Sequence, residues 1–185
     1  MTKRICLIGI CALSIFFIPV RGLSNSPIQK TYLGFSIGFG LPKIPISRFR
    51  TPISILGGGS LNYRLGTHMA LQLNGYGLYT FSLGTLNDQS GELRFNLLWV
   101  SMDLQRRLRG LIDEGSYLMA GVGRYRLSQQ YDNDEDILNT MGLSIGLSQW
   151  KRLRRVTSIF EIRWHLLFHP SPKPQVVTVN FGLMF

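Results

Sequence analysis

The sequence of 185 residues is long enough for one domain with its own buried interior. Only 16% of the residues are charged, whereas glycine (20 residues) and phenylalanine (11 residues) are abundant, which excludes an intrinsically disordered protein. The formal net charge of +10 does not indicate nucleic-acid binding, because the arginines alternate with apolar residues instead of clustering on a helix.

The amino-terminal segment has the pattern of a secretory signal peptide. Lys3 and Arg4 precede the sixteen uncharged residues Ile5–Val20, a run shorter than the about 20 apolar residues that a membrane-spanning helix needs. We place the cleavage site near Gly22 or Ser24. The predicted organisation is a signal peptide, a short N-terminal extension and one folded domain: 1–22, 23–29 and 30–185.

Both cysteines, Cys6 and Cys11, lie inside this segment, so its removal leaves a mature chain without a thiol. A disulfide framework, a cysteine-ligated metal and a cysteine nucleophile are thereby excluded, and no cofactor is expected. Three of the 20 basic residues and none of the 10 acidic ones lie before residue 23, so the mature chain has 17 basic and 10 acidic residues, a net charge of +7.

The mature chain alternates between large apolar residues and small or polar ones, which is typical of β-strands with two different faces. The alternation is clearest at the two ends of the folded domain. The apolar positions there are Leu33, Phe35, Ile37 and Phe39 at the start, and Val177, Val179, Phe181, Leu183 and Phe185 at the end. Small residues on the opposite face suit a narrow barrel interior with lipid outside.

The pattern predicts an all-β protein: an eight-stranded antiparallel up-and-down transmembrane barrel after an N-terminal signal peptide. The predicted strands are 33–40, 53–65, 69–81, 92–105, 116–127, 138–149, 156–168 and 177–185. Proline cannot donate to a sheet ladder, and all eight prolines fall outside these ranges. In the fourth strand the alternation changes phase near Val100, which indicates a β-bulge.

With both termini in the periplasm, the connections alternate between outer loops and periplasmic turns. The predicted outer loops are 41–52, 82–91, 128–137 and 169–175. The predicted turns are 66–68, 106–115 and 150–155, and the last two are long and basic. The interior of an eight-stranded barrel is filled by side chains, so no wide pore is expected.

Several segments resemble the outer-membrane β-barrel domain superfamily, the OmpA/OmpX-like small barrels. They are Gly57–Leu65 (GGGSLNYRL), Tyr117–Tyr125 (YLMAGVGRY), Gly142–Gly146 (GLSIG) and Phe160–His165 (FEIRWH). The resemblance covers residues 30–185 and implies a location in the outer membrane of a Gram-negative bacterium, but no single activity. The alternating residues Phe181, Leu183 and Phe185 resemble the carboxy-terminal signal that the barrel assembly machinery reads.

The polar positions of the predicted strands form a candidate network inside the barrel. Glu161, Arg163 and His165 share one face of the seventh strand. The arginines predicted at interior positions of other strands are Arg64, Arg94, Arg124 and Arg126. Because a buried carboxylate is costly unless guanidinium groups surround it, we interpret this set as a structural plug, with a proton or ligand pathway as the alternative. The change of phase leaves the direction of Asp103 open.

Two other groups of residues are candidate sites. His169 and Ser171 resemble the His-x-Ser of the lipid A 3-O-deacylase barrels, in which histidine activates serine for acyl transfer, but no acidic residue follows Ser171. Asp132, Asp134 and Asp136 offer carboxylates for a divalent cation. Their spacing lacks the glycine and the terminal glutamate of an EF-hand loop, so a solvated acidic loop is the simpler interpretation.

The leading hypothesis is an outer-membrane barrel without enzymatic activity, whose role is structural, adhesive or based on interactions of its outer loops. A lipid A 3-O-deacylase-like hydrolase and a soluble lipocalin-like carrier are the alternatives. The expected partners are outer-membrane lipid and lipopolysaccharide, and the barrel assembly machinery during biogenesis. We expect a monomer.

Overall fold

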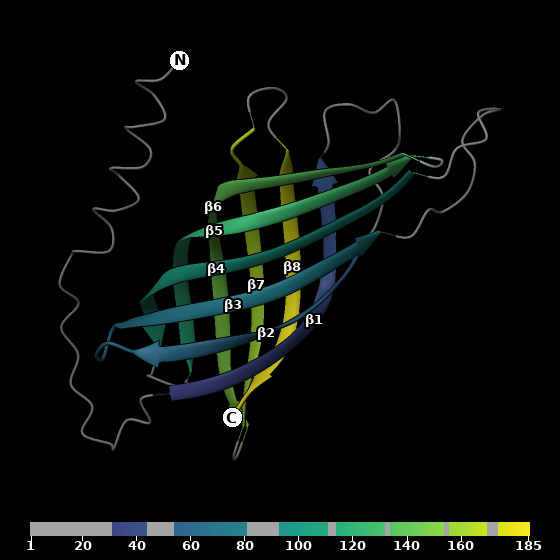
Figure 1. Ribbon diagram of the computed structural model, residues 1–185. Coiled ribbons are helices and arrows are strands. Elements are labelled where there is room, and N and C mark those ends of the chain that lie inside the picture. Colours follow the sequence, from purple (N-terminus) through teal and green to yellow (C-terminus); the bar gives the residue numbers. More distant parts are fainter. Residues whose placement is uncertain are drawn as a thin grey trace.

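A computed structural model describes residues 31–43, 54–80, 93–110, 114–131, 134–153, 156–169 and 174–185. The predicted signal peptide and extension lie outside these ranges. Eight strands form a closed barrel in which each strand pairs with the next and β1 pairs with β8, all antiparallel (Figure 1). The predicted fold class is confirmed. Among the described residues, no helix is long and apolar enough to cross a membrane.

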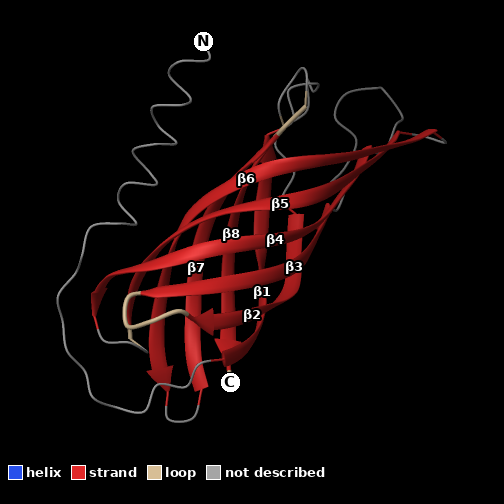
Figure 2. Ribbon diagram, turned by 60° about the vertical axis from the view of Figure 1, so that its left-hand side comes forward, coloured by secondary structure: helices blue, strands red, loops and turns tan. Residues whose placement is uncertain are grey.

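The strands differ twofold in length. Their bounds are β1 Thr31–Lys43, β2 Ser54–Arg64, β3 Met69–Thr80, β4 Leu93–Gly110, β5 Gly115–Tyr131, β6 Asp134–Leu153, β7 Val156–Leu167 and β8 Gln175–Met184. Strands β4, β5 and β6, with 18, 17 and 20 residues, are the longest. Strand β6 extends beyond its neighbour β7, with which it pairs only from Gly142 onward (Figures 1 and 2).

Three predicted connections are shorter in the structure than the sequence pattern indicated. Strands β5 and β6 continue through most of the predicted loop 128–137, up to the pair Tyr131 and Asp134. Strand β4 likewise continues to Gly110, and β6 continues to Leu153. The predicted strands were too short because polar and basic residues were assigned to loops. Beyond the membrane, however, backbone ladder bonds do not require apolar side chains.

The proline criterion was wrong at one position, because Pro42 lies in β1 and pairs with Val176 of β8. The ladder between β1 and β2 ends at Gly40 and Ser54. Beyond that point β8 is the one described neighbour of β1, so a residue without an N–H is tolerated there as it is on an edge strand.

The large apolar side chains of the strands form a belt around the outside of the barrel. Phe35, Trp164 and Phe181 are 57%, 41% and 51% exposed, and they come from β1, β7 and β8. A continuous exposed belt of this kind, on strands that form a closed ladder, fits hydrocarbon and not water. It also contradicts the alternative of a soluble lipocalin-like carrier, whose exterior would be polar.

The fourth strand does not change phase near Val100, contrary to the prediction. Phe95, Leu97 and Trp99 point into the barrel together with Asp103, in one uninterrupted alternation. The irregularity in β4 lies further on, between Arg107 and Arg109, near the end of the strand. The prediction failed because large apolar residues were assumed to face outward along the whole strand.

The interior is layered along the barrel axis. An apolar cluster of Leu56, Tyr76, Leu78, Phe95, Leu97, Trp99, Tyr125, Leu127, Leu167 and Val176 fills one end. A second cluster of Tyr32, Tyr117, Trp150, Ile159 and Met184 fills the other. Along β7 the inward residues run from Ile159 through Glu161 and Arg163 to Leu167, so a polar layer separates the two clusters.

Candidate functional site in the barrel interior

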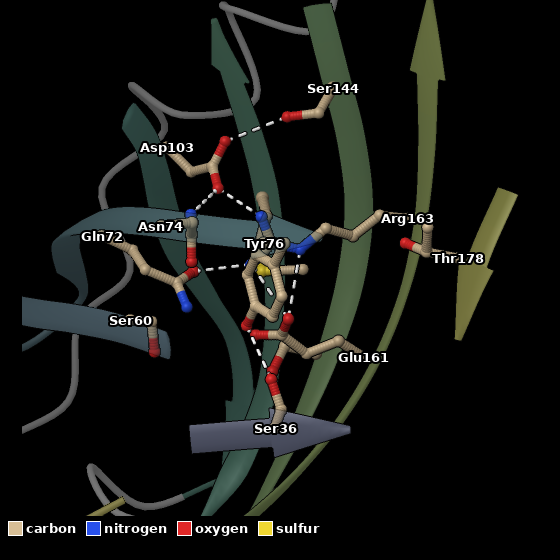
Figure 3. A network of polar contacts seen from close by, with 12 residues as sticks. Ser36, Ser60, Gln72, Asn74, Tyr76, Asp103, Ser144, Glu161, Arg163 and Thr178 are labelled. Atoms are coloured by element: carbon tan, nitrogen blue, oxygen red, sulfur yellow. Dashed lines mark hydrogen bonds and ion pairs between the residues drawn. The ribbon is translucent and has the colours of Figure 1, made fainter. Parts of the chain in front are cut away.

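The polar layer is built by inward side chains that come from different strands. Gln72 and Asn74 come from β3, Asp103 from β4, Ser144 from β6, and Glu161 and Arg163 from β7 (Figure 3). Two glycines of the neighbouring strands provide the space. A Cβ added at Gly121 would lie 1.8 Å from Asp103 Oδ1, and one at Gly146 would lie 2.9 Å from Arg163 Cγ.

Arg163 is the centre of this layer and is almost completely buried. Its Nη1 donates to Asp103 Oδ2 in an ion pair. Its Nη2 donates to Glu161 Oε2 at 2.9 Å and to Gln72 Oε1 at 2.9 Å, and its Nε donates to Glu161 Oε2 at 3.1 Å. One guanidinium group thus joins β3, β4 and β7 across the lumen, with charge-assisted hydrogen bonds to two carboxylates.

Asp103 is the acceptor on which the donors of the layer converge. Besides Arg163, it accepts from Asn74 Nδ2, from Ser144 Oγ at 2.9 Å and from Ser101 Oγ at 3.5 Å. The sequence left the direction of Asp103 open. A single alternation through Ser101, Asp103 and Gln105 would have placed it inside, and this polar run was the available signal.

The layer contains one guanidinium and two carboxylates, so its formal charge is negative. Glu161 Oε1 is buried and makes no hydrogen bond with a described residue. Asn180 of β8 is the ladder partner of Glu161, and its buried side-chain amide likewise makes no hydrogen bond with a described residue. Glu161 is therefore held less completely than Asp103, although both contact the same arginine.

His165 lies in the interior but does not join the ion pairs. Its Nδ1 lies 3.0 Å from the Tyr125 hydroxyl, and its Nε2 lies 3.3 Å from Thr178 Oγ1. Its ring meets the Trp99 ring edge-on, with centroids 5.1 Å apart. His165 therefore belongs to an aromatic layer beside the ion pairs, and its partners are neutral.

Arg64 also points inward, but at the end of the barrel where β1 starts and β8 ends. Its guanidinium lies 4.9 Å from the centroid of the Tyr32 ring and 5.9 Å from that of Trp150. Cation–π contacts of this kind stabilise a desolvated guanidinium. It is therefore separate from the layer around Arg163.

Two residues assigned to the interior network lie outside the barrel. Arg124 and Arg126 are exposed on the outer face of β5, and Tyr125 between them points inward and is completely buried. The assignment was wrong because the interior of β5 is occupied by bulky residues such as Tyr117 and Leu127, not by polar ones. The side chain of Arg94 is not among those that the structure describes.

The other candidate residues lie at the ends of strands. His169 follows β7, whereas Ser171 lies outside the described residues, so their relation stays a prediction. Asp134 and Asp136 begin β6, and Asp132 lies outside the described residues. No group of three metal-ligating side chains gathers in the described part of the chain.

The proposed assembly signal lies on the outer face of the last strand. Phe181, Leu183 and Phe185 are all exposed at alternate positions there. Their position leaves them accessible from the membrane side, while their recognition by the assembly machinery stays a prediction.

The closed ladder, the exposed apolar belt and the charged but internally paired lumen define the class of the protein: it is a small outer-membrane β-barrel. No model of a known protein family matches the sequence. No curated protein matches it either.

Solved structures match the fold at low sequence identity. Neisserial surface protein A matches with a TM-score of 0.60 and 11% identity over 83% of this chain and 95% of that one. A major outer membrane protein from Thermus thermophilus matches with a TM-score of 0.58 and 11% identity, over 85% of this chain and 100% of that one. Ail, the attachment invasion locus protein of Yersinia pestis, matches with a TM-score of 0.54 and 11% identity, over 85% of this chain and 100% of that one. The resemblance to small outer-membrane barrels is thus confirmed for the fold.

Proposed function

We propose that this barrel is a non-enzymatic membrane anchor that presents its outer connections, above all the β5–β6 hairpin, for contacts at the cell surface. The observation that carries the proposal is the filled lumen. Arg163 joins strands across the middle of the barrel, and apolar clusters lie at both ends of this layer. Such an interior favours a rigid scaffold over a passage for solutes.

The β5–β6 hairpin extends past the point at which β6 and β7 pair. At a rise of about 3.4 Å per residue, the 20 residues of β6 span roughly 65 Å, or about 45 Å along the axis at a tilt of about 45°. The apolar band of such barrels is only about 25 Å tall. Pairing of β6 with β7 begins at Gly142 and Leu167, so the segment from Asp134 to Met141 has β5 as its main neighbour.

The name of one structural neighbour supports a surface role. Ail is the attachment invasion locus protein, and it has also been solved in complex with the heparin analogue sucrose octasulfate. For the present chain we propose the same general mode, contact through outer connections. The tip of its hairpin is acidic in sequence, DNDED from Asp132 to Asp136, so a cationic partner surface is the expected complement.

The experiment removes the hairpin tip and leaves the barrel wall intact. Residues 129–136 are replaced by Asn-Gly, a two-residue turn that suits the flanking pair Ser128 and Ile137. We expect the variant to reach the outer membrane and to keep heat-modifiable gel mobility, but to lose binding of whole cells to a polylysine-coated surface. Unchanged binding would contradict the role of the hairpin, and recovery in the soluble periplasmic fraction would contradict the membrane location.

Two further measurements test the absence of other activities. Refolded protein in planar bilayers should give no conductance typical of a wide pore. Lipid A from cells with and without the gene should have the same mass spectrum. A mass change that His169→Ala abolishes would establish the deacylase alternative instead.

A further inference from the structure

Two arginines lie on the outer face of the barrel, at the margin of its apolar belt. Arg124 and Arg126 project outward from β5, next to the exposed side chains of Leu98 and Val100 on β4. The register places Arg126 beside Leu98 and Arg124 beside Val100. Charged residues on this face are costly in hydrocarbon, so a pair of them calls for a compensating interaction.

No such interaction comes from the described part of the chain. Across β6, Arg126 pairs with Asn139 and Arg124 with Met141, and neither guanidinium makes an ion pair or hydrogen bond with a described residue. The buried carboxylates Asp103 and Glu161 point into the lumen. The positive charge of this pair is therefore directed at the surroundings of the barrel.

The pair lies at one margin of the apolar belt. Along β5 the outward residues change from Val122 to Arg124, Arg126 and Ser128. Along β4 they change in the same direction, from Val100 and Leu98 to Asn96, and along β6 Asn139 follows Leu143 and Met141, with Ile137 as one further exposed apolar residue. This direction leads away from the carboxy terminus and toward the long hairpin. With the termini in the periplasm, the margin lies where the headgroups of the outer leaflet begin.

A hollow in the outer wall adjoins the arginines. It has a volume of about 450 Å³, and the outward residues lining it are Gly75, Leu98, Val100, Arg124, Arg126 and Asn139. A Cβ added at Gly75 would meet no atom within 4 Å, so open space begins at the backbone of β3. The site thus combines an apolar floor with three polar side chains along one side.

We propose that Arg124, Arg126 and Asn139 form a binding site for a phosphate group of lipid A on the outside of the barrel. Residues two apart on a strand are separated by about 7 Å, so both guanidinium groups can reach one phosphate. Arginine binds phosphate in a bidentate manner, and the Asn139 amide adds a neutral donor. The hollow over Gly75 accepts the adjacent sugar or acyl chain. The inference rests on the outer-membrane location and not on the role of the hairpin.

The test measures lipid retained by the folded barrel. The mature chain is refolded into phosphatidylcholine bilayers that contain lipid A, extracted with mild detergent and examined by native mass spectrometry. We expect the wild type to retain lipid A and R124Q/R126Q to retain at least tenfold less. The matched control R109Q/K151Q removes two exposed charges near the opposite end of the barrel and should retain lipid A like the wild type.

Parallel samples distinguish the phosphate of lipid A from other anionic headgroups. Bilayers with phosphatidylglycerol, or with dephosphorylated lipid A, should leave no lipid specifically bound. Equal retention of phosphatidylglycerol, or equal retention of lipid A by R124Q/R126Q and the wild type, overturns the proposal.

Heat-modifiable gel mobility checks that each variant is folded. The variant R124K/R126K separates the effect of charge from that of bidentate hydrogen bonding, because lysine keeps the charge but not the bidentate geometry. It should retain an intermediate amount of lipid A. Retention by this lysine variant as low as that of R124Q/R126Q would contradict a contribution of charge.

Discussion

Replacing Asp103 by asparagine tests whether the polar layer holds the barrel together. The substitution keeps the size of the side chain but removes one of the two carboxylate charges that Arg163 contacts. An amide NH2 also replaces one of the two oxygens, of which Oδ2 accepts from Asn74 and Oδ1 from Ser144. Breaking a buried ion pair from one side typically costs about 3–5 kcal/mol. Because Glu161 still compensates the charge of Arg163, we expect the lower end of this range, about 3 kcal/mol. We expect a loss of this size in the free energy of unfolding.

Urea unfolding in phospholipid vesicles measures this loss. Trp99 and Trp150 lie inside the barrel and Trp164 on its outer face, so tryptophan fluorescence follows both environments. With a slope of about 2 kcal/mol per molar urea, a loss of about 3 kcal/mol lowers the midpoint by about 1.5 M. A shift below about 0.5 M would refute the argument, because it would correspond to no more than an ordinary hydrogen bond.

Two further variants separate charge compensation from mere packing. Glu161→Gln should cost only about 1–2 kcal/mol, because a single carboxylate oxygen accepts the bonds from Arg163 and an amide oxygen can still accept. The triple variant Asp103→Asn, Glu161→Gln, Arg163→Met has no charge left in the layer, so it should be more stable than Asp103→Asn alone. If the triple variant is the less stable of the two, weaker charge compensation of Arg163 is not the cause of the loss.

Two glycines and one histidine give predictions of a different kind. Gly121→Ala should destabilise the barrel by about 1–3 kcal/mol, because the new Cβ would collide with Asp103, whereas Gly75→Ala, which enters open space, should leave the urea midpoint unchanged. The turn residue His68 accepts a hydrogen bond from Arg107 at 3.0 Å, and burial, followed by the charge of that arginine, lowers the pKa of its imidazole. Because the folded-state pKa is depressed, stability should be full above the unfolded pKa of about 6.5 and decrease as the pH falls through the folded value. His68→Gln should remove this part of the pH dependence, and an identical pH profile in the variant would contradict it.

The sequence predicted the strand number, their order and the outward face of β1, β6, β7 and β8. In these strands one face is small or polar and the other is large and apolar, so alternation alone identifies the lipid-facing side. The same reasoning failed on β4 and β5. There Trp99 and Tyr125 point inward, because the ends of a narrow lumen are filled by large rings. Alternation shows which residues share a face, but not which face is inside when both carry bulky side chains.

Because Arg124 and Arg126 of β5 lie outside the barrel and not inside it, the charges of the barrel form an inner set and an outer set. We expect the two sets to have different functions. Inside, Arg163 is bound by Asp103 and Glu161, so these charges stabilise one another and have little capacity left for a ligand. Outside, Arg124 and Arg126 have no carboxylate partner in the described part of the chain. Since free energy of binding is available only where charges are not already paired, interior substitutions should change stability without changing lipid retention. Substitutions at the two outer arginines should do the reverse.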